Sequence, residues 1–129
     1  MPIHTSSIKI KAPTQRVFEA LTNPELVKLW QFGRELITDW KPGSEILFRT
    51  KWEGKVLEQW GTVLELRPNE LVKYNLFTPS PNLEDKPEFY SVTSYVLTND
   101  NDQTKVEIIQ VDNRPSGFVG ITLKPILVA

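Results

Sequence analysis

The chain contains no cysteine, and this absence removes several kinds of chemistry at once. Disulfide bonds, thiolate nucleophiles and cysteine-ligated zinc are all excluded. Histidine is almost as scarce, since His4 is the only one and precedes the first expected strand. Nothing beyond it offers a Ser-His-Asp or Cys-His arrangement, a glycine-rich phosphate loop or the spacing of metal ligands. We therefore expect no metal and no other cofactor.

An excess of charge of one sign is also missing. Lys and Arg together number 15 and Asp and Glu 16, so the sequence lacks the basic surface that nucleic acid or an anionic membrane would require. No apolar run approaches the ~20 residues of a membrane span, and "MPIHTSSIKIKA" does not look like a signal peptide. At 129 residues the chain is predicted to form a single domain over 1–129, in the cytoplasm.

Strand and helix signals alternate near the N-terminus. "SIKIKA" alternates apolar with polar residues, which is typical of a half-buried strand. In "APTQRVFEALTNPELVKLW", Pro13 and Pro24 each suit the first turn of a short helix, because proline presets the backbone angle φ there. The predicted buried positions of these two helices are Val17, Ala20 and Leu21 in the first, and Leu26, Leu29 and Trp30 in the second.

The rest of the chain reads as a meander of antiparallel strands. A Pro-Gly turn leads into "SEILFRTKW", followed by "VLEQWGTVLEL", "ELVKYNLF", "FYSVTSYVLT" and "TKVEIIQV". The acidic, proline-rich "TPSPNLEDKPEF" is too long for a tight hairpin, so it is either a surface loop or a flap over an opening. The sequence ends in the apolar "SGFVGITLKPILVA". This order predicts an α+β fold in which a bent sheet is covered on its concave side by a terminal helix.

These segments, in this order and spacing, resemble the activator of Hsp90 ATPase homologue 1-like family of the START-like, Bet v 1-like (SRPBCC) superfamily. The resemblance rests on "IKIKAPTQRVFEALTNPELVKLW", "DWKPGSEILF", "GTVLELRPNELVKYNLF" and "SVTSYVLTNDNDQTKVEIIQ". It implies a helix-grip fold, in which a curved antiparallel sheet surrounds a C-terminal helix and two short helices follow the first strand. It also implies a cavity that holds an apolar ligand in many relatives. It implies no shared reaction, and we expect Hsp90 not to be a partner.

The hairpin in "KWEGKVLEQWGTV" has two possible registers. With Glu53 and Gly54 as a two-residue turn, Arg49 faces Glu58, and Trp60 lies on the opposite face from Phe48. With a three-residue turn, Phe48 and Trp60 lie on one face instead.

We adopt an inward-facing Trp60, with a bulge near Gly61 that lets Val63 and the next strand face inward as well. Glu58 is the best candidate for acid or base chemistry, if the neighbouring indoles shield it from water. The alternative, which we favour, is a surface ion pair between Glu58 and Arg49.

Aromatic residues of successive elements are predicted to converge on the concave face. They either fill a core or line a cavity, and we favour a cavity because the same strands supply a few polar groups that would orient a ligand. The predicted ligand-binding residues are Trp30, Phe48, Thr50, Trp52, Trp60, Tyr74, Tyr95, Ile108, Gln110 and Phe118.

The sequence leaves three functions to compare. The first is binding of a small hydrophobic or aromatic molecule, with no catalytic residue assigned. The second is a polyketide cyclase or aromatase-like enzyme that uses a buried acid or tyrosine. The third is an interaction module for a chaperone or for a second copy, which exposed aromatics on the outer sheet face would favour. Because residues 117–129 would form only a short helix, we also predict a homodimer whose terminal segments pack together.

Overall fold

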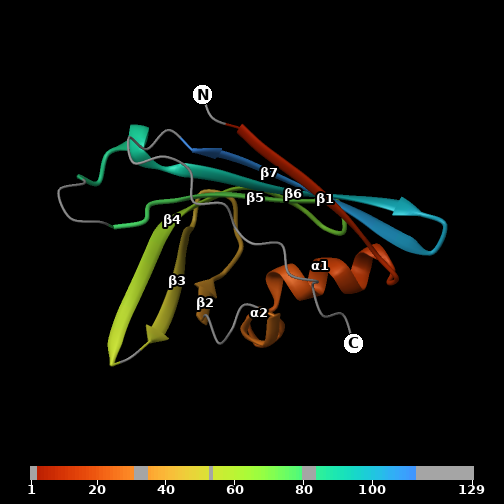
Figure 1. The fold of residues 1–129 in the computed structure, drawn as a ribbon, viewed down its shortest axis with the longest axis horizontal. Coiled ribbons are helices and arrows are strands. Elements are labelled where there is room, and N and C mark those ends of the chain that lie inside the picture. The colour runs from red at the N-terminus through yellow and green to blue at the C-terminus, as the bar shows by residue number, and fades with distance from the viewer. Residues whose placement is uncertain (1–2, 31–34, 53, 80–83, 113–129) are drawn as a thin grey trace.

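The computed structural model describes residues 3–30, 35–52, 54–79 and 84–112, without the side chains of Trp30 and Trp52. These residues form a seven-stranded antiparallel sheet in the order β1-β7-β6-β5-β4-β3-β2, with two helices on one face (Figure 1). The strands are β1 (Ile3–Ile10), β2 (Glu35–Thr38), β3 (Glu45–Trp52), β4 (Lys55–Arg67), β5 (Leu71–Leu76), β6 (Ser91–Asp100) and β7 (Gln103–Asp112). The helices are α1 (Thr14–Thr22), α2 (Pro24–Trp30) and a short 3-10 turn, η1 (Pro87–Phe89).

Both expected proline starts are confirmed. Pro13 is the N-cap of α1 and Pro24 is the first residue of α2, and the side chain of Asn23 accepts a hydrogen bond from the backbone N–H of Glu25 at 3.0 Å. The first helix buries Val17, Ala20 and Leu21, as its spacing predicts.

The buried face of α2 differs from the prediction. Val27 is fully buried, whereas Leu29 is 70% exposed, so the prediction that Leu29 faces the core is wrong. A helix of seven residues makes less than two full turns, and a rotation of one residue is enough to exchange the positions that face the sheet.

The sheet is strongly bent, and the hairpin of β3 and β4 turns away from β5, β6, β7 and β1 (Figure 1). The long strand β4 takes part in both halves. Its pairing with β5 shifts between Val63 and Glu65, where an extra residue forms a bulge. We predicted a bulge near Gly61, so the correct strand was chosen but the position was wrong.

The core lies between the two helices and the inner face of the sheet, which is the face that α1 and α2 cover. Strands β5, β6 and β7 each bury every second residue there. The prediction of an α+β fold, with a curved antiparallel sheet and two short helices after the first strand, is confirmed. The expected C-terminal helix falls in 113–129, outside the described residues.

Candidate ligand-binding site on the inner face of the sheet

Three aromatic side chains form a row across the inner face. Phe48 of β3 packs against Tyr74 of β5, with ring centroids 5.6 Å apart, and Tyr74 packs against Tyr95 of β6 at 6.4 Å. All three are buried, and Ile108 of β7 extends the row because it pairs with Tyr95. The predicted inward direction of these four residues is therefore confirmed. Together they form an apolar floor with two phenol groups.

The inner face changes in polarity along β6 and β7. Next to the helices, Leu97 pairs with Val106, and both are buried apolar residues. Beyond Tyr95 and Ile108, the cross-strand pairs become Thr93 with Gln110 and then Ser91 with Asp112. Of these four polar residues, Thr93, Gln110 and Asp112 are buried. From Leu97 and Val106 onward, the inner face thus changes from apolar to polar with distance from α1, while Thr104, on the other side of Val106, donates to the backbone carbonyl of Ala12.

Trp40 completes the aromatic row, although it was not among the predicted ligand-binding residues. Its ring centroid lies 6.3 Å from that of Tyr74, and its indole Nε1 donates to the backbone carbonyl of Thr22, at the end of α1, at 2.8 Å. The backbone of Trp40 has φ of 60°, a left-handed conformation that few bulky residues adopt. Because the conformation depends on these tertiary contacts, no local pattern could have predicted it.

Trp60 lies on the outer face, which corrects our prediction. The register pairs Leu47 with Trp60 and Phe48 with Gln59, so Trp60 and Phe48 have opposite directions. The turn at residues 53–54 therefore has two residues, and the three-residue alternative is wrong.

On the outer face, Trp60 belongs to an aromatic cluster around Asp85. Its ring lies 5.5 Å from that of Phe77, which lies 5.5 Å from that of Tyr90. Asp85 accepts hydrogen bonds from Trp60 Nε1 at 2.9 Å and from the hydroxyl of Tyr90 at 2.6 Å. Partial burial, followed by the hydrogen bond and charge of Asp85, raises the pKa of Tyr90. Asp85, in the acidic connection after β5, is thus hydrogen-bonded to two aromatic residues of the outer face.

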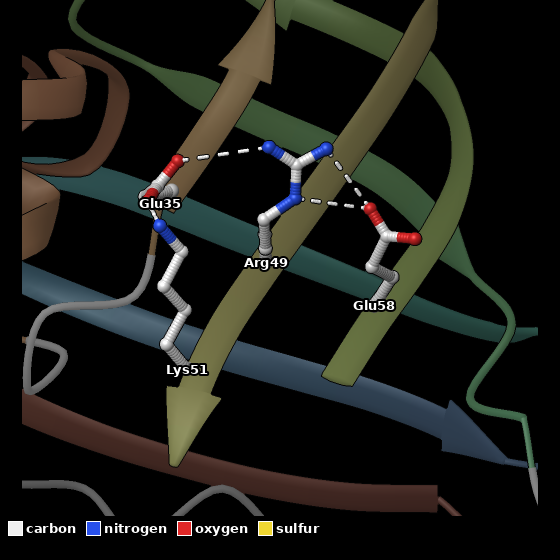
Figure 2. Close-up of polar contacts among 4 residues, drawn as sticks. All are labelled: Glu35, Arg49, Lys51 and Glu58. Atoms are coloured by element: carbon white, nitrogen blue, oxygen red, sulfur yellow. Dashed lines mark hydrogen bonds and ion pairs between the residues drawn. The ribbon is translucent and has the colours of Figure 1, made fainter. Parts of the chain in front are cut away.

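Glu58 forms the surface ion pair that we favoured. Arg49 donates to Glu58 from Nε and from Nη2, and it also approaches Glu35 at 3.9 Å (Figure 2). Lys51 lies 3.9 Å from Glu35, so the cluster joins β2, β3 and β4 on the outer face. Glu58 is paired and 40% of its side chain is exposed, so it is not a carboxylate enclosed by indoles.

A groove of about 530 Å³ lies at the edge of β4 near the hairpin. It is separate from the aromatic row, and its lining residues are Thr50, Val56, Leu57, Glu58, Gln59, Trp60, Thr78 and Pro79. Two predicted ligand-binding residues, Thr50 and Trp60, therefore border this groove. The prediction also included Phe118 and the side chains of Trp30 and Trp52, which lie outside the described part of the chain.

The described ranges offer no cluster of three or more His, Asp or Glu side chains that could hold a metal ion. Within the same ranges, neither α1 nor α2 has the length and apolar character that a membrane crossing requires.

Comparison with protein families gives a clear result. Residues 11–119 match the family described as Activator of Hsp90 ATPase homolog 1-like protein. The chain belongs to this family. The resemblance recognised from the sequence is thereby confirmed, and the match begins directly after β1 and extends across both helices and the strands β2 to β7.

Solved structures of the same shape support the assignment. A Cytophaga hutchinsonii protein is 36% identical over 89% of this chain and 78% of its own, with a TM-score of 0.75. An HSP90 activator from Plasmodium falciparum is 16% identical over 89% of this chain and 75% of its own, with a TM-score of 0.69. The Aha1 dimer from Colwellia psychrerythraea is 21% identical over 91% of this chain and 81% of its own, with a TM-score of 0.66. The last two share the fold. No curated protein matches this member of the family.

Proposed function

We propose that this protein binds a small hydrophobic or aromatic molecule on the inner face of its sheet. The supporting observation is the change in polarity along β6 and β7, from Tyr95 and Ile108 to Thr93 and Gln110. Ligand sites are mostly apolar with a few polar groups that fix orientation, and this face has that composition. The apolar body of the ligand would lie against Tyr74 and Tyr95, with its polar group toward Thr93 and Gln110.

Phe48 and Ile108 extend the proposed contact surface on either side of the two tyrosines. Trp30, Trp52 and Phe118 remain part of the proposal on the basis of the sequence alone. Trp60 is not part of this inner-face site, because it lies on the outer face. Thr50 is two residues from Phe48 on β3 and remains part of the proposal, although it also borders the groove at the β4 edge.

The experiment is a titration of the ¹⁵N-labelled protein with medium-chain fatty acids and flat aromatic compounds, followed by NMR. We expect saturable shifts of the Gln110 side-chain amide and of the Thr93 and Tyr95 backbone amides. Gln110→Leu removes the polar group at similar size and should weaken binding about tenfold, which corresponds to roughly 1.4 kcal/mol. Ser94→Ala is the matched control, because Ser94 is the neighbour of Thr93 on β6 and faces the other way. Equal binding by the wild type and Gln110→Leu, or no saturable shift with any compound, would contradict the proposal.

The structure does not support Glu58, the best candidate for the acid of a cyclase or aromatase-like enzyme. Its defining feature was a carboxylate shielded from water, and Glu58 is instead ion-paired with Arg49 on the outer face. Tyr74 and Tyr95 still provide hydroxyl groups on the inner face, so a tyrosine is the remaining candidate for proton transfer in this alternative.

We do not extend the proposal to Hsp90 as a partner protein. The Plasmodium relative carries the description of an HSP90 activator, but at 16% identity only its fold is shared. We expect no stimulation of Hsp90 ATPase activity by this chain, and a coupled ATPase assay tests this directly.

The predicted homodimer and the cytoplasmic location stay predictions. The dimer was assigned to residues 117–129, outside the described residues, and the Colwellia relative is a dimer in solution. Native mass spectrometry of the full chain and of a chain truncated at 116 would test it. A full-length monomer would contradict it.

A further inference from the structure

The edge of β4 near the hairpin has backbone groups that no described strand pairs with. β4 pairs with β5 as far as Val63 and Tyr74, and the residues that follow β5 continue this pairing at Trp60 and Phe77. Trp60 and Phe77 exchange two backbone hydrogen bonds, at 3.3 and 2.7 Å. In the same register, the next pair that could exchange such bonds would be Glu58 with Pro79. Proline has no N–H to donate, so Pro79 ends the ladder at this point.

The alternation of hydrogen bonds along β4 shows which of its backbone N–H and C=O groups point toward this edge. In an antiparallel pair, every second residue directs its N–H and C=O away from its partner strand. Trp60 directs these groups to Phe77, away from β3, and therefore Glu58 and Val56 direct theirs to the same side. Beyond Pro79, this side opens into the groove of about 530 Å³. Two residues of a strand edge thus face a groove.

The side chains along this edge are unusually apolar for an exposed position. Val56 is 54% exposed and Leu57 is 56% exposed, on opposite faces of β4. Natural edges are usually protected by charge, by proline or by a covering segment. Here the positive charge of Lys55 lies at the tip of the hairpin, beyond the apolar pair, whereas Lys51 is on β3, directly across from Val56.

We propose that the groove binds an extended peptide, which adds as a short strand to the edge of β4 beside Val56 and Glu58. The peptide continues the direction of β5, antiparallel to β4, so its C-terminal end lies near Lys55 at the hairpin tip. It presents apolar side chains to Val56 and Leu57 and an acidic residue, or its terminal carboxylate, to Lys55. Trp60 forms one end of the groove, where Phe77 and Asp85 fix its position.

The size of the edge favours a peptide over a second copy of this chain. Residues 55–59 span roughly 17 Å at ~3.4 Å per residue, which is enough for a strand of about five residues. A dimer held by this edge alone would fall far short of the ~800 Å² per partner in a standard interface. A peptide needs only the backbone bonds and the side-chain contacts of a short strand.

The test begins with selection of random ten-residue peptides, displayed on phage, against the immobilised full chain. We expect the recovered sequences to carry two adjacent apolar residues, one for each face of β4 at Val56 and Leu57, and Asp or Glu toward the C-terminal end. Binding of the synthetic peptides is then measured for Val56→Pro and for Val56→Thr. Proline removes the N–H that faces the groove but no bond to β3, so Val56→Pro should bind at least tenfold more weakly. Val56→Thr retains the N–H and loses only part of the apolar contact, so it should lose much less binding than Val56→Pro does.

Two further measurements keep the result clear if Val56→Pro is poorly folded. Peptide binding to the wild type should slow hydrogen exchange of the Val56 and Glu58 amides. Lys55→Glu should weaken binding in a salt-dependent way, whereas Lys11→Glu, far from the groove, should not. The proposal is overturned if no peptide is enriched, if Val56→Pro binds as tightly as the wild type, or if the two amides stay unprotected. Amide protection that rises with protein concentration, without peptide, would assign the edge to a second copy and also overturn it.

Discussion

Arg49 donates to the same oxygen of Glu58, Oε2, from both Nε and Nη2, at 3.0 Å in each case. The two residues are cross-strand neighbours on the outer face of the β3–β4 hairpin. This contact decides the register, because it requires the two-residue turn and directs Trp60 outward. It also removes Glu58 from consideration as a shielded acid.

Glu58→Gln should therefore have a small effect. Both side chains are partly exposed, and exposed ion pairs contribute about 0.2–1 kcal/mol. We expect the free energy of unfolding, measured in urea, to decrease by an amount within that range. The decrease should be smaller at high salt. A loss above about 2 kcal/mol would show that the pair is more deeply buried than its exposure indicates.

Asp85→Asn should change the titration of Tyr90. Partial burial raises the pKa of Tyr90 first, and the hydrogen bond and negative charge of Asp85 raise it further. Because the folded-state pKa lies above the unfolded value, this contribution to stability is complete below about pH 10 and is lost as the pH rises through the folded-state pKa. Removing the charge should lower the pKa of Tyr90, so its ionisation, followed by ultraviolet absorbance, begins at a lower pH. Tyr90→Phe has no hydroxyl at this position, so the transition that it lacks is the one that belongs to Tyr90. An unchanged transition in Asp85→Asn would contradict the contact between Asp85 and Tyr90.

Gly61→Ala should destabilise the fold more than Gly43→Ala does. A Cβ at Gly61 would overlap the backbone carbonyl of Asn75, so β4 and β5 would have to separate, at a cost of about 1–3 kcal/mol or more. A Cβ at Gly43 meets nothing within 4 Å, but φ there is +87°, and a side chain in that conformation costs about 1–2 kcal/mol. Urea unfolding of both variants measures the difference. The reverse order would mean that β4 and β5 can separate at little cost.

Trp40→Phe should loosen the contact between the end of α1 and the sheet. The variant keeps an aromatic ring near Tyr74 but loses the indole bond to the Thr22 carbonyl, a bond of a kind that contributes about 1 kcal/mol. We expect the unfolding free energy to fall by roughly that amount, with faster hydrogen exchange in the last turn of α1. Trp60→Phe is the control, because Trp60 lies on the other face and should leave exchange in α1 unchanged.

Much of the inner-face site followed from alternation alone. Phe48, Tyr74, Tyr95 and Ile108 were each assigned inward by a period of two, and the structure places them there. The prediction for Trp60 was wrong because its direction depends on the length of the turn at the tip of the β3–β4 hairpin, several residues earlier in the chain. Neither aromatic content nor local alternation distinguishes the two registers, since a slip of one residue exchanges both faces together.

The sequence by itself determined the class of fold and the face on which most of the core lies. Helix starts at Pro13 and Pro24 and the alternation of the strands are local properties, and each is set by the conformations that a few neighbouring residues can adopt. Only the tertiary structure decided the bulge after Val63, the left-handed Trp40, the outward Trp60 and the edge of β4 that opens beyond Pro79. Each of these depends on contacts between residues distant in the chain, whose energies outweigh the local preferences that a sequence displays.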